Sequence, residues 1–105
     1  MEKRLKLQAL LEGLMIGVGF VPNVYFQPPE SVKLNYPCIM YSRSSGETKF
    51  ANDKPYNHQI EYKMTVIDKN PDSELPEKVA SLPMCIFDRH YTADNLNHDV
   101  YNIYY

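Results

Sequence analysis

The sequence has few of the residues on which metal-dependent or disulfide-dependent folding relies. It contains two cysteines, Cys38 and Cys85, and no Cys-x-x-Cys pair, so the patterns of a disulfide scaffold and of a zinc ribbon are both missing. Tryptophan is absent altogether. At 105 residues the chain is still long enough to bury its own core. We therefore expect a single domain over residues 1–105 with two reduced, half-buried thiols.

Long runs of one residue class are also missing. The 11 basic and 13 acidic residues interleave and leave a net charge of −2, without the basic block that neutralises nucleic-acid phosphates. No apolar stretch approaches the roughly 20 residues of a membrane span. The apolar run after Arg4 is interrupted by Gln8 and Glu12 and has no convincing cleavage site. The composition argues against nucleic-acid and membrane partners and against an export signal.

The clearest positive pattern is a strict alternation within residues 58–68. The apolar side carries Ile60, Tyr62, Met64 and Val66. A period of two is typical of a half-buried strand. Because the stretch is about twice the usual strand length, neighbours can pair along both of its edges, which favours a central position in an antiparallel sheet.

The other segments predict elements that pack on this strand. They are a helix over residues 2–16, an edge strand over 23–27, a hairpin with arms at 38–43 and 48–51, a short helix over 73–82, and strands over 84–91 and 98–105 joined by a loop over 92–97. Gly13, in the middle of the first helix, would mark a close approach to the sheet. This order predicts an α+β fold, a mostly antiparallel sheet with an N-terminal helix and a second short helix packed on it, plus a projecting hairpin.

Few residues are of the types that bind metals or act in catalysis, and their spacing in the sequence matches no known motif. The ligand types of a metal site are present as His58, His90, His98, Asp88 and Asp99, but in no metal-binding spacing. We expect solvated or hydrogen-bonded histidines, although His90 and His98 would approach each other if the last two strands pair. Cys85 lies between apolar residues, where a thiolate is disfavoured, and is better explained as a core cysteine than as a nucleophile with His90 as its base. We predict no catalytic residue, no cofactor site and no metal site.

Two segments carry side chains suited to contact with another chain. The tip of the hairpin over residues 43–49 is polar and has little to bury in a core. The closing strand is rich in tyrosine, whose ring is apolar while its hydroxyl stays in water. The predicted contact residues are Arg43, Ser45, Glu47, Lys49, Tyr101, Tyr104 and Tyr105.

Several stretches between residues 24 and 105 together resemble a known family. They are residues 36–41 (YPCIMY), 51–56 (ANDKPY), 62–68 (YKMTVID) with 71–73 (PDS), and 82–83 (LP) leading to 87–89 (FDR) and 91–98 (YTADNLNH). Their order is similar to that in the small neck proteins of long-tailed bacteriophages, the tail-completion or tail-terminator group. The resemblance implies a non-enzymatic virion structural protein, assembled in the host cytoplasm. It further implies a homo-oligomeric ring, a hexamer, that ends the tail tube and joins the tail tube protein to the head connector.

Two other classes of function stay open at this point. One is a small cytosolic enzyme or ligand-binding domain that arranges His90, His98 and Asp88 around a pocket. The other is a monomeric adaptor that binds a peptide by strand addition. Light scattering separates both from a ring, because a ring has several times the mass of the monomer.

Overall fold

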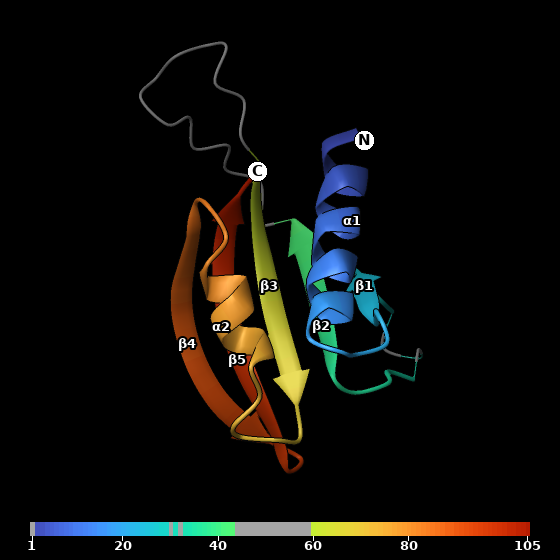
Figure 1. The fold of residues 1–105 in the computed structure, drawn as a ribbon, viewed down its shortest axis with the longest axis vertical. Coiled ribbons are helices and arrows are strands. Elements are labelled where there is room, and N and C mark those ends of the chain that lie inside the picture. The colour runs from blue at the N-terminus through green and yellow to red at the C-terminus, as the bar shows by residue number, and fades with distance from the viewer. Residues whose placement is uncertain (1, 30, 32, 44–59) are drawn as a thin grey trace.

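The computed structural model describes residues 2–29, 31, 33–43 and 60–105 (Figure 1). These residues form a five-stranded mixed sheet with two helices packed on one face, which confirms the α+β class. The elements are α1 (Glu2–Gly17), β1 (Val24–Phe26), β2 (Cys38–Arg43), β3 (Glu61–Asp68), α2 (Leu75–Ala80), β4 (Cys85–Ala93) and β5 (Leu96–Tyr104). The predicted hairpin tip and its return arm, and with them Ser45, Glu47 and Lys49, lie outside the described residues.

β3 occupies the middle of the sheet, as its alternation predicts. The strand order is β1-β2-β3-β5-β4, in which β1 and β2 are parallel and the other neighbours are antiparallel. β1 is a short edge strand, also as predicted. β5 lies between β3 and β4, so α2 connects two strands that run in the same direction with a third strand inserted between them.

The core lies between the sheet and the helices. β3 contributes alternate side chains, Tyr62, Met64 and Val66, all of which are buried. α1 and α2 contribute one stripe each, and β2 and β5 complete the cluster. These further members are Leu7, Leu11, Met15, Ile39, Tyr41, Leu75, Val79, Tyr101 and Ile103. The helical spacing of the α1 and α2 residues places each stripe on the face that meets the sheet.

The connection between the last two strands differs from the prediction. β4 extends to Ala93 and β5 begins at Leu96, so the loop expected over 92–97 is wrong and a two-residue turn stands in its place. Asp94 and Asn95 both adopt positive φ, 54° and 63°. Asp and Asn tolerate this left-handed conformation, which matches the twist of a tight hairpin. The whole segment is polar, so the sequence pattern did not distinguish the two turn residues, Asp94 and Asn95, from a longer loop.

Gly13 does not mark a close approach of α1 to the sheet, so that expectation is wrong. The residue is exposed, and a Cβ placed on it would meet no atom within 4 Å among its described surroundings. The helix therefore carries the conformational cost of a glycine without a packing reason within the described part of the subunit.

We expect Gly13→Ala to stabilise the subunit by about 1 kcal/mol, because alanine is the better helix former and nothing described obstructs its methyl group. Urea unfolding followed by circular dichroism measures the change. Gly19→Ala is the control: Gly19 has a φ of 88°, which alanine adopts only with strain, so this variant should lose stability. A lower unfolding midpoint for Gly13→Ala would contradict the prediction.

Candidate functional site

β4 is the long free edge of the sheet. Its one hydrogen-bonded neighbour is β5, and among the described residues no strand lies beyond it (Figure 1). Every residue of β4 except Cys85 is exposed, including Ile86 at 61% and Phe87 at 54%. An edge strand with exposed apolar side chains is a site of pairing with another chain. We name Met84, Ile86, Phe87 and Tyr91 the β4 flank.

The β4 flank presents apolar groups on both faces of the sheet. Phe87 lies opposite Tyr101 on the helix side, and their rings meet edge to face with centroids 5.5 Å apart. Tyr91 lies opposite His98 on the other face, and these rings stack at 4.6 Å. Contacts with β5 thus hold both aromatic rings in place while leaving them partly exposed, which is the arrangement of a preformed contact surface.

A β-bulge interrupts β4 at Asp88. Phe87 pairs with Tyr101, and Arg89 pairs with Val100, the residue adjacent to Tyr101 in β5. Two steps along β4 thus match one step along β5, so Asp88 is the extra residue. A bulge of this kind shifts which face the following side chains occupy. Asp88 and Arg89 are both exposed, and no ion pair involves either of them within the described part of the chain.

The two histidines of the β4–β5 hairpin lie on opposite faces. His90 Nδ1 lies 2.8 Å from Asp99 Oδ1, and His98 Nδ1 donates to the Leu96 carbonyl at 3.1 Å. The prediction of hydrogen-bonded histidines is confirmed for His90 and His98, whereas His58 lies outside the described residues. The predicted approach of His90 to His98 is wrong, because the register pairs each with a different residue. No cluster of three or more His, Cys, Asp or Glu side chains that could hold a metal occurs in the described ranges.

The two thiols are protonated at neutral pH. Burial, assisted by the nearby Asp68 carboxylate, raises the pKa of Cys38 to about 12. Burial also raises the pKa of Cys85. Both cysteines are free, but Cys38 is fully buried, so the expectation of a half-buried thiol holds for Cys85 and is wrong for Cys38. Their chemistry is that of core side chains, as predicted for Cys85.

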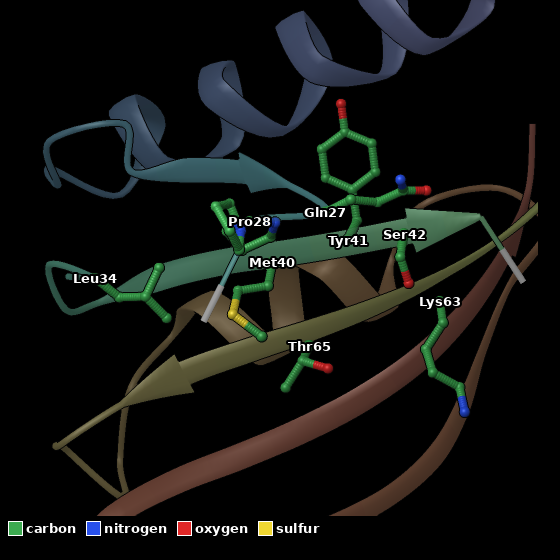
Figure 2. Close-up of a pocket in the computed structure, with 9 residues that line it drawn as sticks. Gln27, Pro28, Leu34, Met40, Tyr41, Ser42, Lys63 and Thr65 are labelled. Carbon is green, nitrogen blue, oxygen red and sulfur yellow. The ribbon is translucent and has the colours of Figure 1, made fainter. Parts of the chain in front are cut away.

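A groove of about 390 Å³ lies on the sheet face opposite the helices, between β2, β3 and the segment after β1. Figure 2 shows Met40, Lys63 and Thr65 pointing into it, whereas Tyr41 points toward α1. Its outer wall is formed by Pro28, Pro29 and Leu34. The residues of the enzyme alternative, His90, His98 and Asp88, do not line this groove.

The predicted contact residues divide into three groups. Tyr101 is 3% exposed and its hydroxyl donates to the Pro76 carbonyl at 3.0 Å, so its ring belongs to the core. Tyr104 and Tyr105 are partly exposed, and Arg43 is exposed at the end of β2. The other three fall outside the described residues. The β4 flank was missed because a strand that is apolar on both faces is typical of the buried centre of a sheet.

Large apolar side chains are also exposed on the opposite side of the molecule. We name Leu5 and Ile16 of α1, together with Val21 just after it, the α1 flank. Gln8 of α1 donates to the Val24 carbonyl, which fixes the helix to the β1 end of the sheet. In the described ranges no helix is both long and apolar enough to cross a membrane. Comparison with models of protein families, with characterised proteins and with solved structures gives no match.

Proposed function

We propose that the chain is a structural subunit of a bacteriophage neck, which assembles into a ring that ends the tail tube and joins it to the head connector. The observation that carries the proposal is the pair of exposed apolar flanks, one along the β4 edge of the sheet and one on α1 and the segment after it, which lie on the β1 side of the molecule (Figure 1). Two different apolar patches on opposite sides favour head-to-tail contact, and such contacts close into a ring when the rotation between subunits allows it. Each contact also covers the free edge of β4.

The segments that resemble phage neck proteins support this proposal by their position. Residues 38–41 lie in β2, residues 62–68 in β3, and residues 87–98 span the β4–β5 hairpin. They therefore make up adjacent strands of one sheet. The remaining stretches of the resemblance lie outside the strands: residues 36–37, 71–73 and 82–83 are in connections, and residues 51–56 fall outside the described residues.

Contacts along the ring axis are assigned to one end of the sheet. Arg43 pairs with Tyr62, and the adjacent Glu61 pairs with Tyr104, so the ends of β2 and β5 lie together. The Tyr104 hydroxyl donates to Glu61 Oε2 at 3.3 Å, and the Tyr105 backbone N–H donates to the Ile60 carbonyl at 3.0 Å. We assign this end to contact with the tail tube protein or the head connector.

Sedimentation velocity and electron microscopy of the purified chain test the ring. We expect closed particles with several times the monomer mass. Ile86→Lys on the β4 flank and Ile16→Lys on the α1 flank should each abolish them, because either change places a charge in an apolar contact. Ser31→Lys, an exposed position on neither flank, is the control and should leave the ring intact. A monomer at every concentration, or a ring that tolerates both flank variants, would contradict the proposal.

The free edge of β4 also favours the second candidate, an adaptor that binds a peptide by strand addition. β4 is nine residues long, and the residues whose backbone groups point away from β5 offer them to an extended segment. The two candidates differ in mass, because the adaptor stays monomeric until its peptide is added.

A further inference from the structure

We infer that β4 pairs with β4 of a second copy, antiparallel about a two-fold axis that passes between Asp88 and Arg89. The resulting symmetric dimer covers the free edge of both sheets. The inference does not rest on the proposed ring, but it uses the same strand. A subunit in the dimer is therefore held out of the ring, and the two assemblies compete for β4.

Charge complementarity at the centre of β4 supports this pairing. With the axis between Asp88 and Arg89, each Asp88 lies opposite Arg89 of the second copy, which creates two ion pairs. Both side chains are exposed, and in the described part of the subunit neither is engaged in an ion pair. Opposite charges that face each other across strands stabilise the pair, and like charges destabilise it.

The bulge makes the faces of the two strands match. In a regular strand, residues five apart lie on opposite faces and cannot oppose each other across a two-fold axis. The extra residue at Asp88 removes this obstacle: Ile86 pairs with Asn102 and Tyr91 with His98, which are four apart on β5 and so share a face. In the dimer Ile86 lies opposite Tyr91 of the second copy, so two exposed apolar side chains cover each other.

The residues on the helix side of β4 match in the same way. Phe87 pairs with Tyr101 and His90 with Asp99, which are two apart on β5, so Phe87 and His90 also share a face. In the dimer Phe87 lies opposite His90 of the second copy. The His90 imidazole is already held by Asp99 at 2.8 Å, so an ordered ring meets the Phe87 ring.

The backbone N–H and C=O groups of β4 also point in the directions that this pairing requires. The Tyr104 N–H donates to the Met84 carbonyl at 3.1 Å, so Met84 turns its backbone groups toward β5. In an antiparallel ladder the direction alternates, which directs the groups of Phe87 away from β5. The tight turn after Ala93 makes Ala93 turn its backbone groups toward β5. Counting back from there with the same alternation, the backbone groups of His90 point away from β5. The two residues that would face each other thus both offer free N–H and C=O groups.

Charge reversal tests the pairing in the Ile16→Lys background, in which the α1 flank cannot support a ring but β4 is unchanged. We expect this parent to sediment as a dimer with twice the 12.2 kDa mass of the chain. Adding Asp88→Arg, or adding Arg89→Asp, places like charges opposite each other and should weaken the dimer by about tenfold or more. An equimolar mixture of the two charge variants restores both ion pairs, so native mass spectrometry should show heterodimers of one of each.

Disulfide cross-linking tests the register. Ile86→Cys with Tyr91→Cys should give a covalent dimer on mild oxidation, because these positions oppose each other between the copies. Ile86→Cys with Ala93→Cys, also exposed but out of register, is the control and should cross-link far more slowly. A monomeric parent, charge variants that dimerise as well as the parent, or a mixture without heterodimers would overturn the inference. So would equal cross-linking of both cysteine pairs, whereas a ring that fails to form in the wild-type chain would not affect it.

Discussion

Truncation after Asn97 is expected to leave a chain with no cooperative unfolding transition. The deletion removes most of β5, which pairs with β3 on one edge and β4 on the other. It also removes the buried side chains Val100, Tyr101 and Ile103. At about 2 kcal/mol for each buried side chain, the loss of apolar burial alone is roughly 6 kcal/mol. A domain of this size has a total stability of about 5–15 kcal/mol, so the truncated chain should be unfolded or insoluble.

Far-UV circular dichroism on heating measures this result. The double variant Tyr104→Ser with Tyr105→Ser is the gentler comparison, because it keeps the backbone of β5 and alters two partly exposed rings. We expect it to fold with a loss of about 1–3 kcal/mol. A truncated chain with a sharp melting transition would mean that β3 and β4 form a stable sheet without the strand between them.

Leu11→Ala should destabilise the subunit by about 3 kcal/mol, the second largest effect. Leu11 is fully buried in the middle of the α1 stripe, between Leu7 and Met15, and contributes to the main core. Removing three buried carbons costs their transfer free energy and leaves a cavity that the sheet below cannot fill by moving. Urea unfolding gives the free-energy change directly.

Leu10→Ala is the matched control for this variant. Leu10 is the same residue on the same helix, one position away, but it is 37% exposed where Leu11 is 0% exposed. The change in helix propensity is identical, so the difference between the two variants isolates burial. We expect less than about 1 kcal/mol for Leu10→Ala, and equal losses in both variants would show that α1 is not packed by the face described.

The centre of the fold could be predicted from the sequence because burial contrast is strongest there. The alternation of Tyr62, Met64 and Val66 determines both the strand and the face that meets the helices. At the edge the contrast disappears: Thr92 and Ala93 are exposed although they are strand residues paired with β5. For this reason the sequence predicts a loop where β4 ends. The parallel pairing of β1 with β2 is a matter of chain direction, about which periodicity says nothing.

The candidate site was predictable only in part, for a related physical reason. Periodicity shows which side chains alternate, but it does not show which strand lies beside which. Because β5 lies between β3 and β4, β4 is left at the edge, and its apolar residues Ile86 and Phe87 are exposed. Tyr101 shows the converse, because its position on the inner strand buries a ring that composition alone suggested for contact.

The position of β5 between β3 and β4 has a consequence for the order in which the sheet forms and opens. The tight turn at Asp94 and Asn95 makes the β4–β5 hairpin a local structure, and hairpins form in about 1–10 μs. Docking of that hairpin on β3 must bring together residues such as Met64 and Tyr101, far apart in sequence, and is the slower event. In the native state the strands can separate in a different order from that in which they formed: β4, at the edge, can detach while β5 stays bound to β3. Amide protons that β5 donates to β3 therefore exchange only through global unfolding, whereas those shared with β4 exchange through this smaller opening.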